Sequence, residues 1–154
     1  MPSFWASIGK SRVEAGVLYF KDGKPTFTMN LLDIERPKWQ GAEALPPGKR
    51  TVVFDWKMDP QGMAVGRGGT GTLSVNGSQV AQRSLPHTQP FLWAWDETFD
   101  VGLDTGTSVD NIDYHVPFAC TGKLEKITFD LGETSMTPEA IMAMMEELAK
   151  KRDR

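Results

Sequence analysis

A β-hairpin signature decides the fold of this chain: residues 15–32 read AGVLYFKDGKPTFTMNLL. Two β-prone runs, Ala15–Phe20 and Thr26–Leu32, flank the pair Asp22-Gly23. An Asp-Gly pair at this position predicts a tight hairpin, because both central residues of the favoured turn need positive φ angles. We therefore expect antiparallel β-structure to begin here.

A second hairpin is predicted further along the chain, where Asn76-Gly77 separates Thr72–Val75 from Ser78–Arg83. The six residues before it, Gly66–Gly71, contain four glycines. A phosphate-binding loop would need a helix after the glycines, but a β-prone run follows instead. We expect a tight turn or bulge that leads into a strand.

Three more segments have strand character. Arg50–Met58 alternates, with Val52, Phe54 and Trp56 on one face. Pro90–Trp95 and Leu124–Leu131 are the other two candidates, whereas Glu35–Pro47 contains three prolines and is predicted to be a loop. Short strands at this spacing are typical of an antiparallel sandwich or barrel.

The C-terminus changes period. Thr137 suits a helix N-cap and Pro138 the first helical position. The apolar residues that follow recur at helical spacing; they are Ile141, Met144, Met145 and Leu148. The predicted fold is a mainly β, concanavalin- or jelly-roll-like β-sandwich over residues 1–132, with 1–15 as an N-terminal segment. A C-terminal α-helix with a basic tail is predicted over 133–154.

Composition limits the function. The 154 residues carry a net charge of −3 at pH 7, which argues against binding to nucleic-acid phosphates. The single cysteine, Cys120, excludes an intramolecular disulfide. No signal peptide and no apolar run of membrane-spanning length is apparent, so we expect a cytoplasmic protein with no membrane contact.

An acidic stretch is the first candidate site. Lys and Arg are absent between Arg83 and Lys123, whereas aspartates recur there. Oxygen-rich loops bind Ca²⁺, and the candidate ligands are Asp96, Asp100, Asp104 and Asp110. The alternative is a solvated acidic surface in which aspartates shape turns, with no cofactor.

The second candidate site is aromatic. Trp93 and Trp95 share one face of a strand and could stack on a saccharide, or else fill the core. The two histidines, His87 and His115, are further candidates for ligand binding. Neither has a defensible Ser-His-Asp spacing, and the Asp104-Thr105-Gly106 tripeptide is too short to indicate an aspartic protease.

Several motifs follow one another in an order typical of a known family. They are Leu18–Pro25, Asn30–Arg36, Pro47–Lys49, Gly66–Leu73, Val75–Gly77, Asp96–Gly102, Asp104–Thr107, Tyr114, Pro117-Phe118, Thr121–Lys123 and Glu125-Lys126. This order resembles the C-terminal β-rich region of bacterial arylsulfatases of the large sulfatase type. The resemblance covers Gly16–Leu131, about three-quarters of the chain.

The resemblance does not extend to the sulfatase reaction. In that family the formylglycine precursor, a Cys or Ser, has Pro two residues on and Arg four residues on. After Cys120 those positions hold Gly122 and Leu124. The α/β catalytic domain and its metal ligands have no counterpart here, so we expect no sulfatase activity and no enzyme function from this chain alone.

The resemblance also begins late, because the family has β-strands before the segment that matches Gly16. Lost strands would expose a sheet edge or an apolar face, which the N-terminal segment, the C-terminal helix or another chain would have to cover. We therefore expect a homo-oligomer, most simply a dimer.

Three functions follow from these observations. The first is a non-catalytic, arylsulfatase-C-terminal-like accessory domain that acts in binding or oligomeric assembly. The second is a subunit that completes an active site on a separate sulfatase-like catalytic chain. The third is a carbohydrate-binding module with a saccharide or sulfated ligand. A fold by itself does not choose between them.

Overall fold

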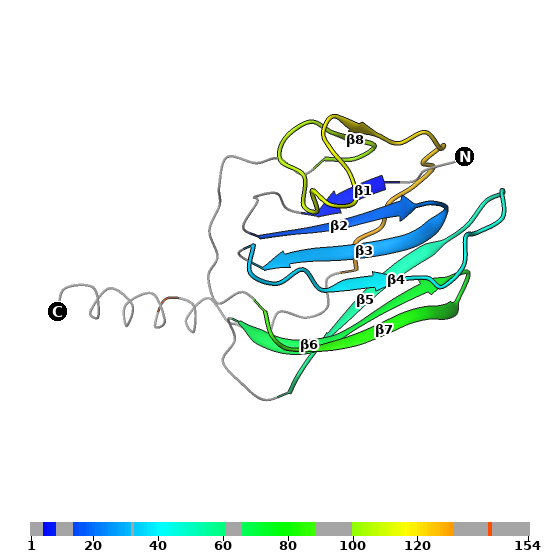
Figure 1. The fold of residues 1–154 in the computed structure, drawn as a ribbon. Coiled ribbons are helices and arrows are strands. Elements are labelled where there is room, and N and C mark those ends of the chain that lie inside the picture. Colours follow the sequence, from blue (N-terminus) through cyan, green and yellow to red (C-terminus); the bar gives the residue numbers. More distant parts are fainter. Residues whose placement is uncertain are drawn as a thin grey trace.

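The protein is mainly β, with antiparallel pairing throughout (Figure 1). The structure, a computed structural model, describes residues 5–8, 14–31, 33–60, 66–88, 100–130 and 142. The strands are β1 (Trp5–Ile8), β2 (Glu14–Lys21), β3 (Lys24–Leu31), β4 (Lys38–Gln40), β5 (Val52–Met58), β6 (Arg67–Val75), β7 (Ser78–His87), β8 (Leu103–Asp104) and β9 (Phe118–Ala119). They form a four-stranded sheet β1-β2-β3-β4, a three-stranded sheet β5-β6-β7 and the pair β8-β9.

Both predicted hairpins are confirmed. Asp22 and Gly23 join β2 to β3 with φ angles of 52° and 78°, and Asn76 and Gly77 join β6 to β7 with 49° and 82°. These paired positive angles match the right-handed twist of the strands, which is why Asp-Gly and Asn-Gly are favoured there. The two turns therefore set the register of both main sheets.

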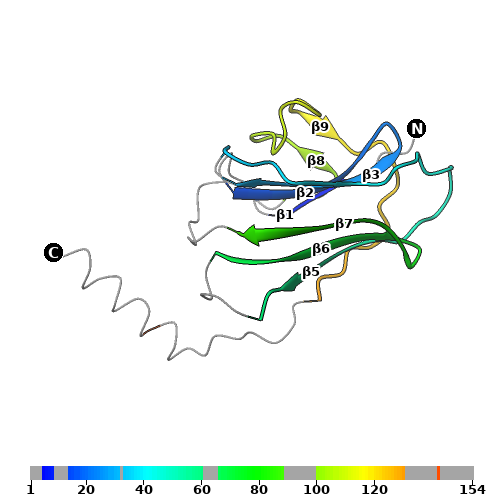
Figure 2. The ribbon, with the colours of Figure 1, turned by 60° about the horizontal axis from the view of Figure 1, so that its bottom comes forward.

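The two main sheets lie one above the other, and their facing side chains form one core (Figure 2). Phe27, Leu31 and Trp39 come from the four-stranded sheet, whereas Leu73 and Leu85 come from the three-stranded sheet. Strand β5 confirms the predicted alternation, because its residues Val52, Phe54 and Trp56 pack against this core while the residues between them are exposed. Phe54 stacks on Phe27 with ring centroids 3.6 Å apart.

The glycine run makes room for these rings. Gly66 has a φ of 77° and leads into β6, as the sequence predicts for a turn that enters a strand. Within β6, a Cβ atom on Gly71 would lie 2.8 Å from the rings of Trp39 and Phe54. The indole nitrogen of Trp39 donates a hydrogen bond of 2.8 Å to the Gly71 carbonyl oxygen. Glycine here lets an aromatic side chain lie directly on the strand backbone.

A further segment covers the other face of the four-stranded sheet. Residues 100–120, which we call the cover segment, contain β8 and β9 and lie over β1 and β2 (Figure 1). A second core cluster joins them to the sheet: Val17 and Tyr19 of β2 pack with Val109 and Tyr114. The Tyr19 and Tyr114 rings are 5.6 Å apart. Strands β2 and β3 therefore have side chains packed on both faces of the sheet.

Two predicted elements differ in the structure. Glu35–Pro47 is not all loop, because β4 lies inside it and pairs with β3. Leu124–Leu131 was predicted as a strand, yet the described residues 124–130 form none. Their alternation gives two distinct sides, but no described strand supplies the backbone partner that a strand requires.

The N-terminal segment supplies one strand of the four-stranded sheet. β1 pairs with β2, and Trp5 lies opposite Tyr19 in that register. Of the three candidates that the sequence left open, the N-terminal segment therefore covers the edge of β2, and β1 is the edge strand of the sheet. Two other predictions, the strand Pro90–Trp95 and the C-terminal helix, lie outside the described residues, apart from the helical residue Met142. In the described part of the chain, no helix is long and apolar enough to cross a membrane.

Candidate functional site: a polar cluster beneath the cover segment

The face of β3 that meets the cover segment is polar. Thr26, Thr28 and Asn30 alternate with the core residues Phe27 and Leu31, so they point to the opposite side of the sheet. All three polar side chains are buried. A buried polar face needs hydrogen-bonding partners. The sheet itself supplies them for Thr26 and Thr28, through Gln40 and Tyr19, and the cover segment supplies one for Asn30.

The densest contacts surround Asp113 of the cover segment. The Tyr19 hydroxyl donates a hydrogen bond to its Oδ2 atom, and the Lys38 ammonium donates to the same oxygen at 2.5 Å. Lys38 also donates to Asp110 Oδ2 at 2.8 Å. The Lys21 ammonium donates to the main-chain oxygen of Asp113 at 2.8 Å. Together with Thr28, whose hydroxyl is 3.3 Å from the Tyr19 oxygen, these residues form what we call the polar cluster.

The charges in the polar cluster reinforce each other. Burial opposes the charge on Lys38, but hydrogen bonds to Asp110 and Asp113 outweigh it and raise the pKa of the ammonium. Burial likewise opposes the charge on Asp113, but Lys38 and Tyr19 outweigh it and lower the pKa of the carboxyl. Burial and the neighbouring Asp113 raise the pKa of the Tyr19 phenol. At neutral pH the phenol is therefore a hydrogen-bond donor beside an ion pair.

A second buried network lies beside the first. Tyr114 donates its hydroxyl hydrogen to Asp104 Oδ2 at 3.0 Å and accepts a hydrogen bond from the Val109 amide at 3.0 Å. Asn30 of β3 donates to the Val109 carbonyl oxygen at 3.2 Å. Burial raises the pKa of the Tyr114 phenol. The Tyr114 bonds hold the cover segment in shape, and the Asn30 bond joins it to the sheet.

The structure describes three of the four predicted calcium ligands, and two of these carboxylates already have partners within the chain. Asp104 and Asp110 are 0% and 2% exposed; the first bonds to Tyr114 and the second to Lys38. Asp96 lies outside the described residues, and Asp100 is at the start of the cover segment. Among the residues that the structure describes, no three acidic, His or Cys side chains converge as a metal site would require. Calcium binding stays a prediction.

The expected solvated acidic surface is wrong for two of these carboxylates, since Asp104 and Asp110 are buried. The reason is that they are hydrogen-bond acceptors for the sheet and for their own segment. The expectation that aspartates shape turns is confirmed at Asp110, whose Oδ1 accepts from the amides of Ile112 at 3.0 Å and Asp113 at 3.3 Å.

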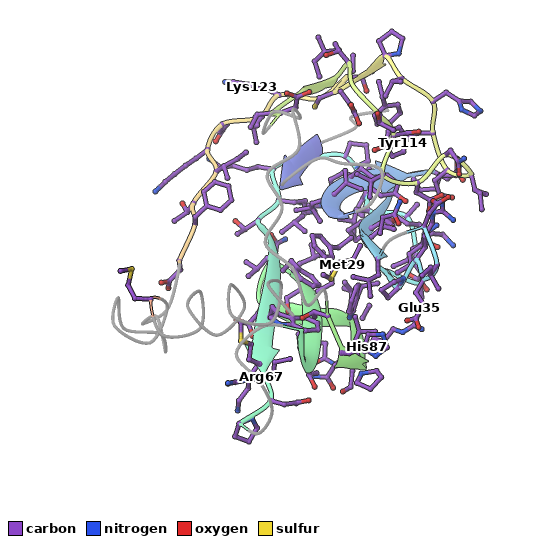
Figure 3. All side chains as sticks on the ribbon, turned by 90° about the vertical axis from the view of Figure 1, so that its left-hand side faces the viewer. Met29, Glu35, Arg67, His87, Tyr114 and Lys123 are labelled. Carbon is purple, nitrogen blue, oxygen red and sulfur yellow. The ribbon has the colours of Figure 1, made fainter. Side chains whose placement is uncertain are left out.

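The histidines lie apart from the polar cluster. His87 ends β7, and its Nε2 atom is 3.7 Å from Glu35 Oε1, at an end of the sheets visible in Figure 3. His115 is exposed in the cover segment, next to Tyr114. Trp93 and Trp95 lie outside the described residues.

Sequence reasoning did not find the polar cluster. Its signal is the alternation of Thr26, Thr28 and Asn30 with apolar residues, which marks one face of β3 as polar. That pattern alone does not predict burial, because an exposed strand face looks the same. Lys38 and its partner Asp113 lie far from each other in the sequence, and only the fold brings their side chains together.

Comparisons with known proteins add no relative. No protein-family model, no curated protein and no solved structure matches this chain. The fold defines a class of protein: it is mainly β, with two antiparallel sheets that face each other. The outer side of one sheet is covered by the cover segment, which polar contacts and the second core cluster hold in place.

Proposed function

We propose that this chain is a non-catalytic β-sandwich domain of the concanavalin or jelly-roll kind, which acts by binding a partner or by assembly. The resemblance of Gly16–Leu131 to the C-terminal region of bacterial arylsulfatases supports this proposal. So does the use of the acidic residues: Asp104 and Asp110 are buried and hydrogen-bonded within the chain, so their carboxylates serve the fold.

One observation supports the contact surface, namely the apolar side chains that the cover segment exposes. Val101, Leu103 and Ile112 are 45%, 46% and 79% exposed, whereas Asp104 and Asp110 of the same segment are buried. Val109 and Tyr114 already pack the segment on the sheet, so the three exposed side chains are not part of that core. Exposed large apolar groups are informative exceptions to ordinary burial, and exposed apolar patches mark interaction sites.

The proposed occupant of this surface is a second copy of the chain, in a symmetric dimer. A two-fold contact places the same apolar residues of each copy against each other, so one exposed surface satisfies both. A separate sulfatase-like catalytic chain is the other partner that the resemblance implies, and copurification with such a chain distinguishes it from the dimer.

Light scattering at micromolar concentration tests the dimer. We expect a dimer mass for the wild-type chain and a monomer mass for Leu103→Asp or Ile112→Asp, because a charge at the contact would have to be buried unpaired. Val53→Asp is the matched control: Val53 is also about half exposed, but it lies on β5 of the other sheet. A monomeric wild-type chain would rule out self-assembly through this surface.

An activity assay tests the other half of the proposal. We expect no turnover of an aryl sulfate, with or without added divalent metal. Metal-dependent turnover by the purified chain would refute the non-catalytic assignment.

A further inference from the structure

Two groups of the polar cluster donate to one carboxylate, that of Asp113, from two strands of the sheet. Tyr19 and Lys21 come from β2, Thr28 from β3 and Lys38 from β4. The first and the last share the same oxygen atom of Asp113, while Lys21 holds the carbonyl oxygen of that residue. A phenol and an ammonium group on one carboxylate oxygen, with a second ammonium group on the main-chain oxygen of the same residue, make a donor set for binding an oxyanion.

The carboxylate that these donors bind belongs to a turn of the cover segment, whereas the donors belong to the sheet. Asp113 lies in the short turn 110–113, which stays in shape through the amide bonds to Asp110 Oδ1. The sheet strands are fixed independently by their ladders. The backbone that carries Tyr19, Lys21 and Lys38 is therefore fixed without the Asp113 side chain.

We propose that this face of the four-stranded sheet is a carboxylate-binding site that the chain's own Asp113 occupies as an internal ligand. An external ligand that carries a carboxylate competes with the Asp113 side chain for Lys38 and Tyr19. This inference goes beyond the proposed function, since it concerns the inner side of the cover segment and not its apolar outer side.

A monoanionic carboxylate suits the site better than a dianion. Asp110 remains 2.8 Å from the Lys38 ammonium after Asp113 is displaced, so part of the positive charge is already neutralised. A second negative charge on the ligand would face the Asp110 carboxylate without a further cation. We therefore expect acetate to be bound in preference to sulfate.

Replacement of the internal ligand tests the site. Asp113→Ala removes the carboxylate but keeps the main-chain oxygen that accepts from Lys21. In sodium acetate at several times its Kd, we expect the Tm of this variant to rise by about 2–4 °C relative to sodium chloride at equal ionic strength. We expect no acetate-specific rise for the wild type or for Asp55→Ala, which removes an exposed carboxylate on β5. A variant that folds in acetate and not in chloride would support the site equally.

A second variant separates this site from a general salt effect. Lys38→Met combined with Asp113→Ala removes the main cation, so the acetate-specific rise should vanish. Equal Tm values in acetate and chloride for Asp113→Ala, or an acetate-specific rise that persists in the double variant, would overturn the inference.

Discussion

Substitution of Lys38 by methionine probes the polar cluster most directly. Methionine keeps an unbranched stem of similar length, so the change removes the ammonium and little packing. Two charge-assisted hydrogen bonds disappear, the 2.8 Å bond to Asp110 and the 2.5 Å bond to Asp113. Asp110, which is 2% exposed, then keeps its charge in a buried place with only amide donors on its other oxygen.

The expected loss of stability follows from these contacts. A hydrogen bond to a charged group contributes about 1.5–3 kcal/mol, and breaking a buried ion pair costs about 3–5 kcal/mol. Lys38 is 30% exposed, so water screens part of its interaction and the lower end applies. We expect the free energy of unfolding to fall by about 2–3 kcal/mol, with a Tm decrease of roughly 5–10 °C.

The direction of the pKa shifts determines how the stability difference between the wild type and Lys38→Met depends on pH. Because the pKa of Asp113 is lowered in the folded state, its contribution is present above the unfolded value and is lost as pH falls through the folded pKa. Because the pKa of Lys38 is raised, its contribution is present below the unfolded value and is lost as pH rises through the folded pKa. The wild-type advantage over Lys38→Met should therefore stay level from about pH 5 to about pH 9.

Urea unfolding at several pH values measures both quantities. Lys49→Met is the matched control, because Lys49 pairs with Glu125 on the surface and is 81% exposed. Exposed pairs contribute about 0–1 kcal/mol, so this control should lose little. If Lys38→Met lowers the free energy of unfolding no more than Lys49→Met does, the polar cluster does not hold the cover segment on the sheet.

The remaining predictions concern packing, turn geometry and the second network. Gly71→Ala should destabilise the fold by about 1–3 kcal/mol in urea unfolding, because its Cβ would collide with the ring of Trp39; a neutral result would mean that the rings can move aside. Gly77→Ala meets no atom within 4 Å but has a φ of 82°, so a smaller loss of about 1 kcal/mol should appear by the same measurement, and a loss as large as that of Gly71→Ala would contradict the assignment to turn strain. Tyr114→Phe leaves the buried Asp104 without this donor, and a thermal melt should show a loss of about 1–3 kcal/mol; an unchanged Tm would show that water replaces the hydroxyl.

Short sequence motifs predicted those elements whose structure depends on the backbone geometry of neighbouring residues. Asp22-Gly23 and Asn76-Gly77 predicted both hairpins, because the turn type is set by φ preferences of the two residues themselves. The alternation in Arg50–Met58 predicted the inner face of β5 for the same reason. Leu124–Leu131 has an equal alternation, yet its described part is no strand, because a strand also needs a partner that local sequence does not specify.

The candidate site depends on contacts between distant residues, which explains why it was missed. The acidic stretch drew attention through its charge, and the sequence predicted either a cation site or a solvated surface. Neither prediction considers a third use, in which Asp110 and Asp113 accept hydrogen bonds from Lys38 on an interior sheet face. Nothing near Lys38 in the sequence marks it as their partner, since the residues are more than 70 positions apart.

The hairpins join neighbouring strands, whereas the cover segment is held by contacts between distant residues, and this contrast implies an order of folding. The turns at Asp22-Gly23 and Asn76-Gly77 join strands that are neighbours in sequence, so closing each hairpin costs little loop entropy. The bond from Tyr19 to Asp113 spans 94 residues and closes a long loop. We expect the hairpins to form early and the cover segment to dock last. It should also be among the first parts to open under mild denaturant, ahead of the core between the two sheets.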